Sequence, residues 1–559
     1  MKRKATRIKV FVISGIISIS SVLFFSFKSD NFEISKNLDI FYTLYRELNL
    51  YYVDEVDPGK IVKTGIDAML ESLDPYTVYI PESKIEDFRF MTTGAYGGIG
   101  AMIGHRDGKV VITDPYEGFP VQKAGLRAGD VILEIDGVEV EGASPDDISE
   151  MLKGRPNTEV VLKIKRPGRD EPFTETLYRE KIQVKSVPYA EMLNDEIAYI
   201  RLVNFTDKAS KEVVEAFQKL KNEHDPKGII LDLRSNPGGL LMEAVKICNI
   251  FVEKGSMIVS TKGKVKQWDN EYRTTETALD TEIPVAVLVN SGSASASEIV
   301  AGAMQDLDRG LIIGQRTFGK GLVQTTRPLS YNSQLKVTTA KYYIPSGRCI
   351  QALDYSHRNE DGSVGRIPDS LISEFQTNNG RTVYDGGGIV PDVKIEPYEF
   401  SEIAIHLIKE HMIFDYATEY RNTIDSIPPP AEFEINEAEY DKFKNWLDDK
   451  EFEYTTKSEK QLEKLEKNAI EEKYYVLVEE EFKTLHKNLK SNIAKDLDDF
   501  DIEIKELLGE EIVSRYYFQS GTIQMNLNFD PEVKKAVKAL SDSSFYSNIL
   551  SGQEELEIA

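Results

Sequence analysis

The chain has 559 residues, of which 41% are hydrophobic and 29% charged, and its formal net charge is −25. This length is too great for one hydrophobic core and predicts roughly three or four domains. So acidic a chain is not expected to bind nucleic acid, because binding phosphate requires a basic face.

Residues that commonly bind metals are few and scattered. The two cysteines, Cys248 and Cys349, exclude a disulfide framework and a cysteine zinc cluster, and they leave open either one disulfide or two separate thiols. None of the six histidines stands in HExxH or another ligand spacing. We therefore expect neither a metal nor a cofactor.

The first thirty residues differ from the rest of the chain. A basic start, MKRKATRIK, precedes an apolar run at residues 10–27. As a helix, this run would extend about 27 Å, enough to cross a thin bilayer. A cleaved signal peptide is the alternative, but no small-x-small cleavage site follows. We expect residues 1–29 to be a membrane anchor or signal segment. The rest of the chain would then be extracytoplasmic (periplasmic) and anchored to the inner membrane by residues 10–27.

Residues 30–90 are predicted to be a mainly helical segment. Apolar residues recur there at a spacing of three to four. Asp57 followed by Pro58 is typical of a helix start, with the aspartate as N-cap and the proline at the first helical position.

Residues 91–184 combine short strands with turns. Asp136–Gly137 between two strand-like runs predicts a hairpin. Ser144 followed by Pro145 predicts a capped helix. These elements indicate a compact domain of strands with one or two helices.

Residues 185–398 alternate buried strands, glycine turns and helices, which predicts parallel βα units. Residues 399–559 are rich in Lys, Glu, Leu and Phe at helical spacing without a strict heptad, so we expect a helical domain. No catalytic motif is present in it, and an interaction role and plain structural packing are equally open.

The stretch VLVNSGSASASEIVAG, from Val287 to Gly302, is the first candidate for chemistry. A buried strand ends and a helix begins there, so a serine at the corner lies near unpaired N–H groups that stabilise an oxyanion. An ordinary N-cap serine uses the same groups. These physical arguments alone allow either Ser293 or Ser295 as a nucleophile.

A nucleophilic serine needs a base, and no histidine is well placed to supply one. His224 lies in a polar loop, whereas Lys320 stands between two glycines, with Phe318 and Leu322 on either side. An ordinary lysine has a pKa of about 10.4, and burial among apolar groups lowers it by up to several units. The apolar flanks therefore allow a buried lysine base; the alternative is a surface residue in a glycine turn.

Several motifs occur in the order and spacing of bacterial C-terminal processing (tail-specific) peptidases, which the chain resembles over residues 37–397. They are LDLRSNPGG, GSASASEIVAGAMQD, GQRTFGKGLVQ, TTAKYYIPSGR and GGGIVPDV. YGGIGAMIG with AGLRAGDVILEIDG resembles the PDZ domain of those enzymes. The resemblance implies an α/β fold. It would have a crotonase/ClpP-like βα peptidase core, an inserted PDZ domain, an N-terminal helical segment and a C-terminal helical domain.

The resemblance also implies roles for individual residues. Ser295 matches the nucleophile, Lys320 the base and Gln324 the residue that orients the lysine. Asp306 matches an aspartate that supports the site in some members.

Backbone groups complete the implied sites. The oxyanion donors would be the N–H of Ala296 and that of Gly238 or Gly239. The loop of the PDZ domain that binds a peptide carboxylate would comprise Tyr96, Gly97, Gly98, Ile99 and Gly100.

The implied function is a serine endopeptidase with a Ser-Lys dyad. It would process or degrade extracytoplasmic proteins recognised through the PDZ domain by free, apolar C-termini, and a homo-oligomer is possible. Two alternatives are a catalytically inactive PDZ scaffold protein and a crotonase-like enzyme for small acyl substrates. Both catalytic residue types are present, which argues against the scaffold, and the PDZ-like domain argues against the acyl enzyme.

Overall fold

The computed structural model describes residues 31–359 and 361–553. The predicted anchor at residues 10–27 lies outside them. Within the described ranges, none of the helices combines the length and apolarity that crossing a membrane requires. The chain divides at residues 79 and 80 into two compact units, which are described separately.

The first unit is helical in its described part, as predicted. Residues 31–51 form a helix, and α2 (Pro58–Glu71) follows it. The Asp57 carboxylate accepts the N–H groups of Gly59 and Lys60 at 2.8 and 3.1 Å, which confirms the predicted N-cap.

The second unit contains the predicted domain of strands. Its sheet has the order β3-β4-β5-β7-β8, with β6 paired to β5. The elements are β3 (Ala101–Arg106), β4 (Lys109–Pro115), α4 (Pro120–Lys123), β5 (Val131–Ile135), β6 (Val138–Glu139), α5 (Pro145–Leu152), β7 (Glu159–Lys165) and β8 (Phe173–Tyr178). The Ser144 hydroxyl accepts the N–H of Asp147, so α5 starts at the predicted cap. β2 (Ala95–Gly98) precedes these strands in the sequence and β9 (Glu180–Gln183) follows them. The two form an antiparallel ribbon.

A six-stranded sheet forms the centre of the α/β core, in the order β10-β11-β12-β15-β16-β23. All its pairs are parallel except β10 with β11. The strands are β10 (Tyr189–Met192), β11 (Ile197–Arg201), β12 (Gly228–Asp232), β15 (Val285–Val289), β16 (Leu311–Gly314) and β23 (Val393–Lys394). Parallel strands bring their carboxyl ends to one edge, where the predicted glycine and serine turns lie.

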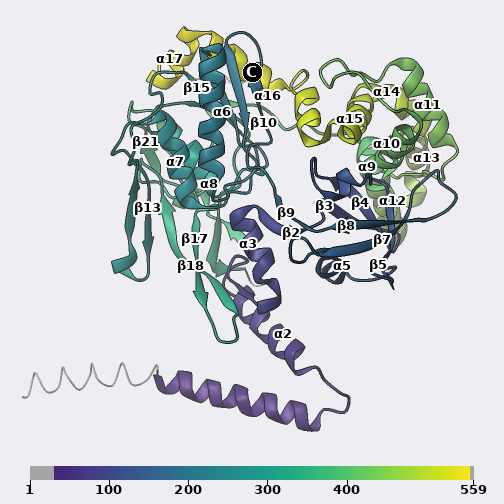
Figure 1. Cartoon of the computed structure of the whole chain (residues 1–559), viewed down its shortest axis with the longest axis horizontal. Coiled ribbons are helices and arrows are strands. Elements are labelled where there is room, and N and C mark those ends of the chain that lie inside the picture. The colour runs from purple at the N-terminus through teal and green to yellow at the C-terminus, as the bar shows by residue number, and fades with distance from the viewer. Residues whose placement is uncertain (1–30, 360, 554–559) are drawn as a thin grey trace, which may run out of the picture. The chain divides into compact units, whose positions relative to one another are not determined.

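Helices cover both faces of this sheet. One face packs on α6 (Ala209–His224), α7 (Leu241–Phe251) and α8 (Ala296–Asp306). The other packs on α16 (Pro531–Ser541) and α17 (Ser543–Ser551), which stand in yellow beside the strands in Figure 1. Both helices come from the range predicted as a C-terminal helical domain.

Polar contacts fix these returning helices. The Arg234 guanidinium pairs with Asp530 and Glu532, both at 2.6 Å. The Val285 N–H donates to the buried Tyr546 hydroxyl at 3.0 Å. The second layer of the core is therefore supplied by residues far along the chain.

An antiparallel sheet lies beside the core. Within it, β18 pairs with both β17 and β13, and β13 also pairs with β14. The strands are β13 (Met257–Gly263), β14 (Asn270–Arg273), β17 (Leu322–Pro328) and β18 (Gln334–Tyr343). Both cysteine thiols are free, which settles the question of a disulfide.

Five helices that precede α16 share an apolar core: α9 (Glu402–Lys409), α10 (Met412–Thr423), α11 (Glu437–Asp448), α14 (Ile493–Asp499) and α15 (Asp501–Asn526). Between α11 and α14, the helices α12 (Lys457–Glu471) and α13 (Glu479–Leu489) contact each other. The strand domain contacts α10: Arg106 pairs with Asp415 at 2.7 and 2.9 Å, and Asn422 donates to the Pro167 carbonyl.

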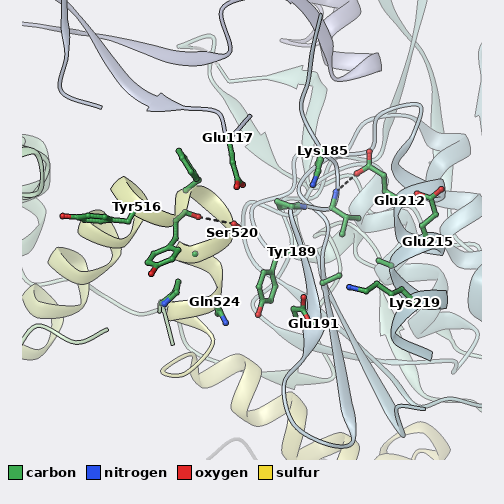
Figure 2. Close-up of a pocket in the computed structure, with 18 residues that line it drawn as sticks. Glu117, Lys185, Tyr189, Glu191, Glu212, Glu215, Lys219, Tyr516, Ser520 and Gln524 are labelled. Carbon is green, nitrogen blue, oxygen red and sulfur yellow. Dashed lines mark hydrogen bonds between the residues drawn. The ribbon is translucent and has the colours of Figure 1, made fainter. Parts of the chain in front are cut away.

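A cavity of about 700 Å³ lies between α6, β10 and α15. Figure 2 shows side chains of β10 between those of α6 and those of α15, with Lys185 of the preceding linker nearby. Four glutamates and two lysines line it, and none of the predicted catalytic or oxyanion residues does. This cavity is therefore separate from the predicted site.

Candidate active site

The nucleophile turn joins β15 to α8. Ser295 is the N-cap of α8, and its backbone has φ +55° and ψ −111°. This conformation is unfavourable for a residue with a side chain and costs of order 1–3 kcal/mol. Such strain persists only where the surrounding contacts hold it, and it is typical of functional turns.

The neighbouring serines have structural roles. Ser293 is fully buried; its hydroxyl donates to the Leu233 carbonyl at 2.8 Å and accepts the Asn290 N–H at 2.9 Å. Ser297 is also buried and donates to the Asn236 carbonyl at 2.9 Å. The structure thus removes Ser293 from the two candidates that the sequence left open.

Gly238 packs directly against this turn. A Cβ at Gly238 would lie 2.9 Å from both the Ser295 Cβ and the Ala296 nitrogen, and its φ is +98°. Only glycine fits there. The turn after β12 and the turn after β15 therefore meet in space.

The two predicted glycine donors differ. The Gly238 N–H donates to the Asn236 Oδ1 at 2.9 Å. Within the described part of the chain, the N–H groups of Gly239 and Ala296 have no hydrogen-bond partner. Ala296 is the first residue of α8, where the helix dipole favours negative charge. Gly239 and Ala296 therefore supply the two unused donors.

The Glu298 carboxylate, which the sequence analysis overlooked, connects the turn to the lysine loop. It is fully buried, and its Oε2 accepts the backbone N–H of both Ser295 and Lys320 at 2.8 Å. Its Oε1 accepts the Gly319 N–H at 2.7 Å and the Thr317 hydroxyl at 2.6 Å. Burial raises the pKa of Glu298, while these donors act in the opposite direction.

The lysine loop links β16 to β17. Lys320 is partly buried, and Leu322 beside it is 7% exposed. Phe318, by contrast, is 49% exposed. Its N–H donates to the Ser293 carbonyl, which anchors the backbone of the loop.

Tyr342 of β18 is a second group at this junction that sequence reasoning missed. It is 1% exposed. Its hydroxyl lies 3.1 Å from the Ser295 carbonyl and 2.5 Å from the Lys320 carbonyl. No local sequence pattern marks this contact, because it depends on how β18 packs.

The other two predicted residues lie further out. The Gln324 amide donates to the Leu322 carbonyl and to the Thr338 hydroxyl, both at 3.3 Å. Asp306 is the last residue of α8, at the opposite end from Ser295, and it pairs with the buried Arg348 at 2.7 Å. Asp306 therefore holds the far end of the helix rather than touching the nucleophile.

Of the five residues predicted to bind a carboxylate, Tyr96, Gly97 and Gly98 lie in β2, and Tyr96 and Ile99 line a groove. Residues of β2, β3 and α5, with Phe90, line a cavity of about 350 Å³. Ile99 is buried, and Gly100 has φ +75°. Burial raises the pKa of the Tyr96 phenol, while hydrogen bonds from the backbone of Gly100 and Ala101 act in the opposite direction.

Together these groups provide a serine, a lysine and two free N–H donors at one corner. That set suits nucleophilic attack on an acyl group with oxyanion stabilisation. Among residues 31–359 and 361–553, no group of three or more His, Cys, Asp or Glu side chains could hold a metal ion.

Comparison with known proteins gives the family. The profile of peptidase family S41 matches residues 196–356. The carboxy-terminal-processing protease of Bartonella bacilliformis is 37% identical over 371 residues, which cover 65% of this chain and 82% of that protein. The chain belongs to peptidase family S41.

Other regions of this S41 peptidase also match known domains and proteins. A PDZ-domain profile matches residues 111–166, and the profile of the C-terminal helical domain of a probable PDZ-protease matches residues 403–540. A probable CtpA-like serine protease of Staphylococcus aureus is 37% identical, over 61% of this chain and 69% of that protein. The photosystem II D1 C-terminal processing protease, a solved structure, is 30% identical over 64% of this chain and 92% of that chain, with a TM-score of 0.35.

The family and its relatives confirm the predicted class of enzyme. The chain is a serine-type peptidase that processes proteins. Its α/β core, PDZ domain and helical segments are also as predicted.

Proposed function

We propose that this peptidase uses a Ser-Lys dyad, with Ser295 as nucleophile and Lys320 as general base. The observation that carries the proposal is the bridge through Glu298. One buried carboxylate oxygen accepts the N–H of both residues at 2.8 Å, so two separate loops are held at one point. Strain at Ser295 and the engaged hydroxyls of Ser293 and Ser297 support the same choice.

In the proposed reaction, neutral Lys320 takes the Ser295 proton as Oγ forms a bond to the peptide carbonyl carbon. The N–H groups of Ala296 and Gly239 stabilise the oxyanion. The C–N bond then breaks, and Lys320 gives its proton to the departing amine. Water, deprotonated by Lys320, hydrolyses the acyl-enzyme and restores Ser295. Gln324 would orient the lysine during these transfers.

The substrates would be proteins with free, apolar C-termini. The groove between β3 and α5 offers apolar side chains, and Tyr96 and Ile99 of the predicted carboxylate-binding residues are among them. A terminal carboxylate would accept backbone N–H groups of residues 96–100. The extended tail would pair with β3.

The proposed site of action is outside the cytoplasm, with residues 10–27 as the membrane anchor. The apolar run behind a basic start supports this arrangement. Protease added to intact spheroplasts should then digest the folded domains. Protection of these domains until the membrane is lysed would exclude the extracytoplasmic location.

The dyad is tested with a protein substrate that carries an apolar C-terminal tail. Ser295→Ala and Lys320→Ala should each lower kcat by at least about 1,000-fold, because removing a nucleophile or its base leaves only binding and oxyanion stabilisation. The matched control is Ser297→Ala, whose hydroxyl binds only a carbonyl. Activity that survives Ser295→Ala would refute the mechanism.

A further inference from the structure

Tyr342 stands at the junction of the two catalytic loops, on the side opposite to Glu298. Glu298 accepts the N–H groups of Ser295 and Lys320. The Tyr342 hydroxyl faces the carbonyls of the same two residues, at 3.1 and 2.5 Å. The backbone of Lys320 is therefore held on both sides of its Cα, and the Ser295 carbonyl lies within reach of the same hydroxyl.

We propose that the Tyr342 hydroxyl is a positioning group for the peptidase reaction, holding the backbone of the base in register with that of the nucleophile. The inference rests on the proposed Ser295–Lys320 dyad. Tyr342 acts through these two residues and does not itself react.

The surroundings of Tyr342 make its hydroxyl a fixed reference point. The residue is 1% exposed and lies in the core of the α/β domain. Its own N–H donates to the Gly321 carbonyl at 3.0 Å, and it pairs with Thr261 across β13. The ring cannot follow the lysine loop if that loop moves, so the hydroxyl constrains the loop.

A role in packing alone would not require the hydroxyl. A phenylalanine ring would fill the same apolar space, and a buried hydroxyl costs free energy unless it is hydrogen-bonded. Here the hydroxyl faces carbonyls of the two residues of the dyad. The hydroxyl has one proton to donate. The shorter contact assigns this hydrogen bond to the backbone carbonyl of Lys320, which lies between two glycines.

The test removes this oxygen alone, with Tyr342→Phe in the full chain. The matched control is Tyr440→Phe in the C-terminal helices. Tyr440 is also 1% exposed, and its hydroxyl donates to the Leu497 carbonyl at 2.6 Å. Both variants should lower the transition temperature by a similar few degrees, because each loses one buried hydrogen bond.

Activity should separate the two variants. Tyr342→Phe should lower kcat about 10- to 100-fold, with KM changed less than about two-fold, because small displacements of reacting groups have effects of this size. Labelling of Ser295 by a fluorophosphonate, which forms a P–O bond and releases fluoride, should slow in parallel. Tyr440→Phe should retain both rates within about two-fold.

Two results would overturn the inference, and they can be told apart. Wild-type kcat and labelling rate in Tyr342→Phe, with Ser295→Ala inactive, would leave the dyad standing and refute the positioning role. Activity in Ser295→Ala would refute the dyad itself. The labelling rate also covers the case in which Tyr342→Phe folds poorly: if the fraction that remains folded labels at the wild-type rate, the positioning role is refuted.

Discussion

The catalytic turns and the PDZ groove are built in different ways. Around Ser295 and Lys320, the groups that shape the backbone are buried and hydrogen-bonded. Glu298 and Asn236 are 0% exposed, and each binds backbone groups of the turns. The groove between β3 and α5 is lined mainly by apolar side chains, many of which remain partly exposed.

Because of this difference, the two regions should tolerate substitutions differently. A hydrogen bond depends on direction and on which partner donates, so a single exchanged atom in a buried turn disrupts it. Apolar contact has no direction and changes gradually with area. Substitutions should therefore have abrupt effects in the turns and graded effects in the groove.

Asp232→Asn should have the largest effect. Asp232 is fully buried at the end of β12, paired with Arg201 at 2.5 Å and Arg234 at 2.6 Å. Removing the Asp232 charge leaves Arg201 without its counter-charge and Arg234 with only Asp530 and Glu532, and breaking a buried pair costs about 3–5 kcal/mol. Denaturant unfolding at pH 7 measures the loss.

The matched control at the groove is Asp146→Asn. The Asp146 carboxylate is exposed and pairs with Lys84 at 2.8 Å, so no measurable loss of stability is expected. An equal loss in both variants would remove the contrast between the two regions.

The stability that Asp232 contributes should also depend on pH. Burial would raise the pKa of Asp232, but Arg234 and Arg201 hold it well below its ordinary value. A pKa lowered in the folded state stabilises the fold above the unfolded pKa of about 3.9, and this contribution is lost as the pH falls toward the folded value. The stability gap between wild type and Asp232→Asn should therefore narrow below about pH 4; a gap that widens would contradict the assignment.

Glu298→Gln should have the next largest effect, on activity. An amide would place N–H donors where the N–H groups of Ser295 and Lys320 now meet an acceptor. A fall in kcat of about 100-fold is expected from displaced reacting groups. The control is Glu503→Gln, another buried glutamate, which accepts from Tyr398 in the C-terminal helices. Comparable rates for the two variants would show that Glu298 does not position the dyad.

Ile103→Asp in the groove should have the smallest effect. Ile103 lies on β3, lines the groove and is partly buried. A charge there should raise KM for a protein with an apolar tail about ten-fold, which corresponds to the loss of one apolar contact. It should leave hydrolysis of a short untailed peptide unchanged. Met102→Asp, on the same strand and 54% exposed, is the control; an equal rise there would argue against recognition by the groove.

Local patterns in the sequence predicted much of this molecule. The caps at Asp57 and Ser144 follow from their own side chains, and the turn at Ser295 follows from a strand that meets a helix. Glu298 carried a signal that could have been used, because Ser295 and Glu298 have the S-x-x-E spacing of a capping box. That pattern accounts for the bond to the Ser295 N–H.

Contacts between distant segments could not be predicted. The second bond of Glu298, to Lys320, and the two contacts of Tyr342 depend on packing between loops. The 49% exposure of Phe318 likewise does not follow from its apolar side chain. The amphipathic pattern of a helix such as α16 predicts that one of its faces is buried. It does not predict which surface covers that face.

The packing of α16 and α17 against the sheet has a consequence for folding during synthesis. A ribosome completes the serine and lysine loops long before it reaches residues 531–551, and domains generally fold as they emerge. Until then, one face of the peptidase sheet lacks its cover, and Arg234 lacks Asp530 and Glu532. A premature stop codon before α16 would therefore leave the proposed Ser295–Lys320 dyad on a sheet with one uncovered face.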